Sequence, residues 1–287
     1  YMPLAEVLLV VLVSKLLGRK VFLVHNGDLV LPRIGVWNRF IEKAYDLVTS
    51  LSIFFSDGVV VQTEDYSNSS SLLKRHRNKW RIVLPLYDDQ GIPIREEVKQ
   101  FKEKYHIGNK RLIGFSGRFV EEKGVDYLIS AIEAVVNKIP NAHFIFAGET
   151  KVFYENFWER IDPLVEKNRD NITFLGIIND QQQLQTFYRS LEVLVQPSRT
   201  DCFPSSQVEA ILCGTPVVCT DIPGARWVVK TTKMGVLVSP QNTHALAEGI
   251  IGVMQNREIY IQPKEEIEKI FDYNKTLNEY ERLFSEN

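Results

Sequence analysis

The chain has 287 residues, 45% of them apolar, which is enough to build two domains with separate hydrophobic cores. Its 34 lysines and arginines nearly balance its 36 aspartates and glutamates, so the composition excludes the strong positive field that is typical of nucleic-acid binding. Three cysteines without a CxxC pair exclude a disulfide framework and a zinc cluster, and they favour a cytoplasmic protein.

In the first half of the chain, helical and strand-like segments alternate. The helical patterns cover residues 4–17 and 36–55, and the strand-like segments cover residues 20–25, 57–63 and 80–85. The longest apolar run, residues 7–13, is far shorter than the roughly 20 residues that span a bilayer. Because Tyr1 and Met2 lead directly into a helical pattern, we expect a fragment that lacks its first strand or strands.

The second half repeats this alternation more regularly, beyond a stretch of turn formers in residues 86–93 that marks the expected linker. Apolar strand-like segments occur at residues 111–117, 142–148, 171–176, 192–198, 215–220 and 234–238. Such alternation predicts an α/β fold, a parallel sheet covered by helices on both faces. We therefore predict two Rossmann-like, doubly wound domains, an incomplete one over residues 1–90 and a second over residues 91–264. A C-terminal helix over residues 265–287 is expected to pack back toward the first domain.

The segment FSGRFVEEKGVDYL follows the first strand of the second domain. Ligands of open α/β sheets bind beyond the carboxyl ends of the strands, so a binding site is expected here. The strand should end at Gly117, with Arg118 after it and Lys123 at the start of the next helix. Two cations beside the N–H groups of a helix start favour a phosphate or diphosphate. The alternative is a solvated loop.

The segment DCFPSSQVEAILCG carries two acids eight positions apart around the expected start of a helix. Pro204 is tolerated in a first turn, and Gly214 is a helix stop. Asp201 then precedes the helix, and Glu209 lies about one turn inside it. This arrangement would suit a ligand that carries hydroxyls at both ends and negative charge in the middle. A nucleotide sugar is such a ligand. The alternative is a capping acid and a surface glutamate.

Taken together, GRFVEEKGVDYLISAI, FIFAGE, ITFLGII and DCFPSSQVEAILCGTPVVCTDIPGAR resemble glycosyltransferase family 4, the group 1 glycosyl transferases. In the first half, VFLVHNGDLVLP and VVVQTEDYSNSS are similar to N-domain segments of bacterial and archaeal members. The resemblance covers nearly the whole chain. It implies the GT-B fold, two Rossmann-like domains, and sugar transfer with retention of the anomeric configuration.

The resemblance also implies roles for individual residues. Arg118 and Lys123 would hold the diphosphate of the donor, Glu209 would hold the ribose hydroxyls, and Asp201 would contact the donor sugar near the reacting carbon. His25 would reach the transferred sugar, with Asp28 as its neighbour. The remaining donor-binding positions, which include main-chain contacts along the base, sugar and phosphates, are Gly117, Gly148, Leu175, Gly176, Ile177, Phe203, Pro204, Ser205 and Ser206.

Three positions depart from the family pattern. Asp201 stands where the family usually has a glutamate, Pro204 replaces a glycine, and Arg226 lies near where many members carry another acid. These departures leave open a catalytically silent, nucleotide-sugar-binding subunit. A GT-B epimerase is disfavoured because the motifs match family 4, and a phosphorylase because no pyridoxal-phosphate lysine signature is present.

The expected activity is a metal-independent transfer from a UDP- or GDP-sugar to a hydroxyl of a glycan or lipid-linked acceptor, in cell-envelope polysaccharide or lipopolysaccharide assembly. No Asp-x-Asp triplet occurs, and no cofactor is expected beyond the nucleotide-sugar substrate. KRHRNKWR, residues 74–81, places five positive charges in eight residues. We expect a solvated helix face there, with contact to the anionic inner face of the plasma membrane as the alternative.

Overall fold

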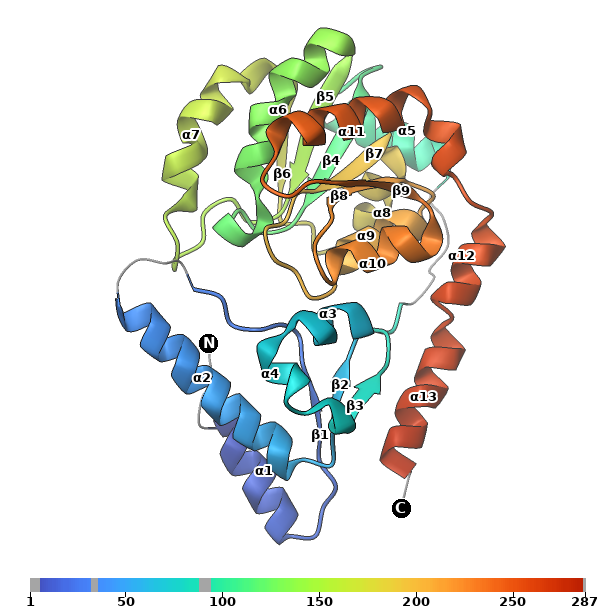
Figure 1. Ribbon diagram of the computed structural model, residues 1–287. Helices are drawn as coiled ribbons and strands as arrows, with labels where there is room; N and C mark the ends of the chain where they lie inside the picture. The colour runs from blue at the N-terminus through green and yellow to red at the C-terminus, as the bar shows by residue number, and fades with distance from the viewer. Residues whose placement is uncertain (1–5, 32–35, 88–93, 286–287) are drawn as a thin grey trace. The chain divides into compact units, whose positions relative to one another are not determined.

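The computed structural model describes residues 6–31, 36–87 and 94–285 (Figure 1). The chain divides into two compact units, each of which is described by itself. Unit 1 is Tyr1–Leu86 with Asp272–Asn287, and unit 2 is Tyr87–Phe271. The expected linker, residues 86–93, lies largely outside the described residues, as does the expected domain boundary at residues 90–91.

Unit 1 contains a parallel sheet of three strands in the order β1-β2-β3. The strands are β1 (Phe22–Val24), β2 (Gly58–Val61) and β3 (Trp80–Ile82), and the helices are α1 (Glu6–Leu16), α2 (Val36–Phe55), α3 (Glu64–Ser69), α4 (Ser71–Lys74) and α13 (Tyr273–Ser285). β2 is buried along its whole length because it lies between the other two strands. Leu283 of α13 packs with Val60 and Val83, so the end of the chain belongs to the core of this unit.

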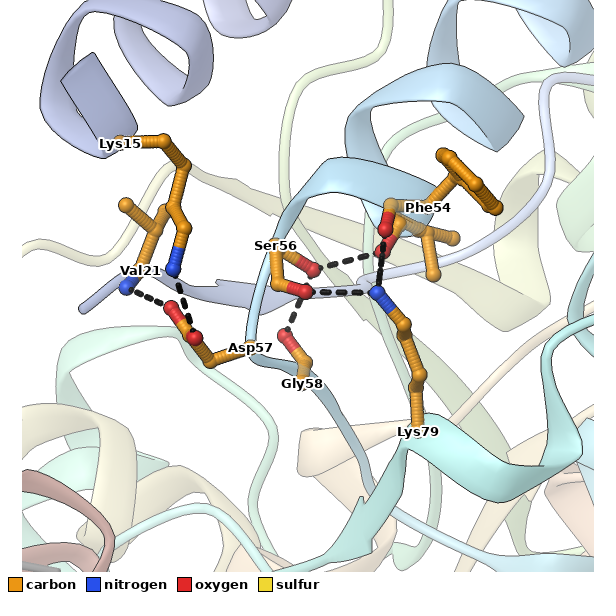
Figure 2. A network of polar contacts seen from close by, with 8 residues as sticks. Lys15, Val21, Phe54, Ser56, Asp57, Gly58 and Lys79 are labelled. Carbon is orange, nitrogen blue, oxygen red and sulfur yellow. Dashed lines mark hydrogen bonds and ion pairs between the residues drawn. The ribbon is translucent and has the colours of Figure 1, made fainter. Parts of the chain in front are cut away.

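A network of polar contacts lies at the C-terminal end of α2 (Figure 2). Asp57 accepts hydrogen bonds from Lys15 Nζ at 2.8 Å and from the backbone N–H of Val21 at 2.7 Å. Lys79 Nζ donates to the carbonyls of Ser56 at 2.7 Å, Ile53 at 3.0 Å and Phe54. The last carbonyls of a helix lack partners within it, so the ammonium of Lys79 serves as the cap of α2.

The predicted single helix over residues 265–287 is two helices, α12 (Lys264–Ile270) and α13. Phe271, which separates them, is buried against Trp227 and Tyr87 in unit 2. Asp272 then starts α13, because its carboxylate accepts a hydrogen bond from the N–H of Lys275 at 2.6 Å. One part of the predicted helix therefore belongs to each unit.

Unit 2 is built on a parallel sheet of six strands in the order β6-β5-β4-β7-β8-β9. The strands are β4 (Arg111–Ser116), β5 (Ala142–Ala147), β6 (Ile172–Gly176), β7 (Val193–Gln196), β8 (Val217–Thr220) and β9 (Gly235–Val238). The chain winds outward from β4 to β6 and then returns to the other side of β4 at β7. This reversal makes the carboxyl ends of β4 and β7 the switch point of the sheet, where ligands of doubly wound folds bind.

Helices cover the sheet of unit 2, as Figure 1 shows. The helices of unit 2 are α5 (Arg95–Lys104), α6 (Val125–Lys138), α7 (Phe157–Lys167), α8 (Gln181–Ser190), α9 (Ser205–Leu212), α10 (Ala225–Thr232), α11 (Thr243–Gln255) and α12. Of these, α5 packs on α8 and α12 packs on α9. One large apolar cluster joins α6, α7 and α11 to alternate strand residues such as Ile113, Phe115 and Val193. Because side chains alternate along a strand, Leu112 and Leu194 point to the other face, where α8, α9 and α10 pack. The predicted doubly wound architecture is confirmed.

Candidate functional site

The loops that follow β4 and β7 lie in direct contact in unit 2. Gly124 has a φ of 64° and precedes α6, and a Cβ at this position would lie 2.1 Å from the carbonyl oxygen of Pro197. Only a glycine permits this approach. The loop after β4, which carries Arg118 and Lys123, is thereby held against the loop after β7, which carries Asp201.

Lys123 and Asp201 form an ion pair across these two loops. Their Nζ and Oδ2 atoms are 2.6 Å apart, and the side chains are only 21% and 7% exposed. Ser198 Oγ lies 3.3 Å from the same carboxylate oxygen. Burial opposes the charge of Lys123, but the neighbouring carboxylate outweighs burial and raises the lysine pKa. The sequence assigned these two residues to separate parts of a ligand, whereas the structure joins them to each other.

Arg118 lies in the same loop but is more exposed. Its Nη1 atom donates to the hydroxyl of Tyr154 at 2.5 Å, and its guanidinium lies 5.8 Å from the centre of that ring. Nη2 lies 3.6 Å from a carboxylate oxygen of Glu122. Tyr154 is half exposed and lies in no recognisable motif, so this contact could not be predicted from the sequence.

Glu209 lies in α9, which begins at Ser205 directly after Pro204, as predicted. The hydroxyl of Tyr188, from α8, donates to Oε2 of Glu209 at 2.7 Å. Burial raises the pKa of Glu209, and this hydrogen bond opposes the rise. In the first turn of α9, the hydroxyl of Ser206 accepts a hydrogen bond from Gln196 Nε2 at 2.8 Å.

Three glycines line the carboxyl ends of the neighbouring strands β4, β5 and β6. The N–H of Gly148 donates to the carbonyl of Gly176 at 2.8 Å, and a Cβ at Gly148 would lie 2.0 Å from the carbonyl oxygen of Gly117. Gly176 has a φ of 70° and open space around it. Ile177, which follows it, is exposed, while Leu175 is partly buried. The close approach at Gly148 brings the backbones of these strand ends together at the carboxyl edge of the sheet.

The other residues of the loop after β7 have structural neighbours. Phe203 is buried with its ring 5.9 Å from that of Trp227, and Pro204 is buried as the cap of α9. Asp201 also forms an isolated parallel bridge with Gly224, the residue before α10. Ser205 is exposed at the start of α9.

His25 and Asp28 belong to unit 1, at the carboxyl end of β1. His25 is buried, and its Nε2 atom lies 3.1 Å from Oδ1 of Asp28. The hydroxyl of Ser70 also donates to that oxygen, at 2.9 Å, and the N–H of Asp28 donates to the phenol oxygen of Tyr66 at 2.7 Å. Burial raises the pKa of Asp28, but these hydrogen bonds together lower it. His25, Asp28 and Ser70 therefore form one hydrogen-bonded cluster in unit 1.

Other potential sites in the described ranges are weaker. A hollow of about 380 Å³ lies at the amino ends of β4 and β7. Its guanidinium groups are already bonded, Arg111 to Glu192 at 3.2 Å and Arg257 to the carbonyls of Glu192 and Gly214. Within the described residues, no cluster of three or more potential ligands could hold a metal ion. None of the helices described there combines the length and apolar character of a membrane span.

The family described as glycosyl transferases group 1 matches residues 97–270, which is more than half of the chain and nearly all of unit 2. The chain belongs to the group 1 glycosyl transferases. The matched region contains both loops and the whole of α9, so the ion pair and Glu209 lie within the part that this family shares.

Similar proteins agree with this membership. The chain is 25% identical over 212 residues to the capsular polysaccharide biosynthesis glycosyltransferase CapM of Staphylococcus aureus, covering 71% of this chain and 54% of that protein. It is 27% identical over 175 residues to the phosphatidyl-myo-inositol mannosyltransferase of Mycobacterium leprae, covering 59% of this chain and 45% of that protein. The chain thus spans about half the length of these curated relatives.

Among solved structures, Anabaena Alr3699/HepE in complex with UDP and glucose superimposes with a TM-score of 0.84 at 16% identity, covering 99% of this chain and 76% of that one. This likeness shows the fold. The predicted GT-B class, with parallel α/β sheets, is confirmed.

Proposed function

We propose that this group 1 glycosyl transferase moves a sugar from a UDP- or GDP-sugar to a hydroxyl of a glycan or lipid-linked acceptor in cell-envelope polysaccharide or lipopolysaccharide assembly. The observation that carries the proposal is the partly buried Lys123–Asp201 pair, which lies at the switch point of the sheet beside Arg118. A cation there can hold the diphosphate of a donor. The relatives named for capsular polysaccharide and phosphatidyl-myo-inositol mannosyl transfer support the setting.

In the proposed mechanism, Arg118 and Lys123 stabilise the negative charge that grows on the diphosphate as the glycosidic bond breaks. When the diphosphate is bound, the ammonium of Lys123 interacts with both the phosphate and Asp201. Asp201 then contacts the donor sugar, Glu209 holds the ribose, and backbone groups near Gly117, Gly148 and Gly176 lie along the donor. We infer retention of configuration and no need for a metal ion from the family resemblance.

A panel of UDP- and GDP-sugars tests this proposal by donor hydrolysis and by transfer to acceptor hydroxyls, with and without EDTA. We expect one nucleotide to support turnover that EDTA leaves unchanged. Arg118→Ala should lower kcat more than donor binding, because the charge of the diphosphate increases in the transition state. Loss of activity with EDTA would contradict metal independence.

A catalytically silent, nucleotide-sugar-binding subunit is the second candidate. It is favoured by Asp201, which is shorter than the usual glutamate and is bonded to Lys123 and Ser198. Binding of a UDP- or GDP-sugar without hydrolysis or transfer across the panel would establish this candidate in place of the first.

We also propose peripheral contact with an anionic membrane on its cytoplasmic face. Unit 1 exposes Trp37 and Phe40 on α2 and carries the basic residues 74–81. In that segment, Lys79 caps α2 and Arg77 pairs with Glu64 at 3.1 Å, so Lys74 and Arg75 are the better candidates for lipid contact.

The combined variant Lys74→Glu with Arg75→Glu should float less with phosphatidylglycerol vesicles, while exposed Lys167→Glu should not change flotation. Equal flotation with neutral vesicles would contradict the contact.

A further inference from the structure

A buried tyrosine fixes one side of the Glu209 carboxylate. Tyr188 is 1% exposed, yet its hydroxyl reaches Oε2 of Glu209 at 2.7 Å. The same hydroxyl lies 3.2 Å from Oγ of Ser116, the last residue of β4. A phenol has one hydrogen to donate, and a carboxylate at the shorter distance is the better acceptor. The hydroxyl of Ser116 therefore donates to Tyr188, and Tyr188 donates to Glu209.

Further hydrogen bonds hold the backbones of the two residues that carry these hydroxyls. Gln196, the last residue of β7, donates from Nε2 to the carbonyl of Ser116 at 2.9 Å. The backbone carbonyl of Tyr188 accepts a hydrogen bond from the hydroxyl of Thr215 at 2.7 Å. These bonds hold the ends of β4 and α8, which carry the two hydroxyls, against the end of β7 and the turn before β8. A satisfied polar network of this kind holds its members in one arrangement.

Glu209 has two carboxylate oxygens, and this network engages Oε2. We propose that Tyr188 is a positioning residue for nucleotide binding, which holds Oε2 of Glu209 and presents Oε1 to the hydroxyls of a bound ribose. The inference rests on the proposed function for the ribose contact, and it adds a residue outside the motifs that suggested that function.

The contact has a consequence for the pH dependence of binding. Among the described residues, the phenols of Tyr188 and Tyr87 are titratable groups that interact with Glu209. The hydrogen bond from Tyr188 favours the ionised carboxylate, so its removal raises the pKa of Glu209 further. The ionised form is the better acceptor for ribose hydroxyls. The acidic limb of nucleotide binding should therefore move to higher pH when the phenol hydroxyl is removed.

The test compares wild type with Tyr188→Phe, which keeps the ring and removes only the hydroxyl. Calorimetric titration with UDP and with GDP, repeated from acidic to neutral pH, gives affinity against pH. Tyr105→Phe is the matched control, because it removes a phenol that contacts Gln183 of the same helix at 3.4 Å, away from Glu209. Thermal unfolding of each variant checks that it is folded, and Ser116→Ala, which weakens the same row of hydroxyls, is the second variant.

We expect Tyr188→Phe to weaken nucleotide binding ~10-fold in the acidic range, the size expected for loss of a hydrogen bond to a charged group. The midpoint should move to higher pH, with a smaller shift for Ser116→Ala and none for Tyr105→Phe. In a Glu209→Gln background, Tyr188→Phe should cause no further loss, because the two residues act as one unit. Wild-type affinity for Tyr188→Phe at every pH would overturn the inference.

A measurement without nucleotide separates this inference from the proposed function. Carbon NMR of the Glu209 carboxylate in the free protein should show a higher pKa in Tyr188→Phe than in wild type. An unchanged pKa would overturn the positioning contact even if nucleotide binds. A raised pKa in a protein that binds neither UDP nor GDP would instead overturn the proposed function, together with the ribose role of Oε1.

Discussion

At the scale of single residues, the Lys123–Asp201 pair offers the clearest energetic prediction. Asp201→Ala leaves an ammonium that is largely buried without its carboxylate, and this should lower the free energy of unfolding by about 2 kcal/mol. The double variant Lys123→Met with Asp201→Ala should recover most of that loss, because no buried charge remains. It should still show no sugar transfer. Chemical denaturation measures the first effect and the donor panel measures the second.

The matched control for this pair is an exposed ion pair of the same unit. Lys167 and Glu133 lie 2.7 Å apart, with both side chains about two thirds exposed. Exposed pairs contribute little to stability, so Glu133→Ala should leave the denaturation midpoint unchanged. If the double variant at Lys123 and Asp201 is as unstable as the single one, the loss does not come from an unpaired charge.

At the scale of secondary-structure elements, Lys79 is expected to stabilise the end of α2. Three carbonyls accept hydrogen bonds from its ammonium, and a cation at the C-terminus of a helix also interacts favourably with the helix dipole. Lys79→Met should therefore cost about 1 kcal/mol and increase hydrogen exchange in the last turn of α2. Lys74→Met, an exposed change in the same basic stretch, is the control. Equal exchange in the two variants would contradict the cap.

At the scale of the whole molecule, the two units have separate apolar clusters, one built on β2 and the other on the six-stranded sheet. Each should unfold in its own calorimetric transition. A nucleotide that binds unit 2 should raise the unfolding temperature of only one transition. Binding should stabilise that unit by about 2.7 kcal/mol when the free ligand is at about 100 times its dissociation constant. A single transition that moves as a whole on addition of UDP or GDP would show that the units unfold together.

Much of the fold of unit 2 could be predicted because its signals are local. Each strand of the sheet is a short apolar run, and α9 begins where Pro204 and the two serines indicate. The helix pattern over residues 36–55 gives α2 with the same bounds. The prediction of a single helix over residues 265–287 was wrong. Continuous amphipathic spacing cannot show that Phe271 is buried in one unit while Leu283 is buried in the other.

The alternation of strands and helices, the start of α9 and the positions of the charged residues follow from the sequence alone. How those charges are partnered depends on the folded chain. Lys123 and Asp201 are 78 positions apart, and Tyr188 comes from a helix that precedes Glu209 by 21 positions. Periodicity records which face of an element is buried, but partners across loops depend on strand order. The reversal between β4 and β7 brings Lys123 and Asp201 together, and the packing of α8 on α9 brings Tyr188 to Glu209.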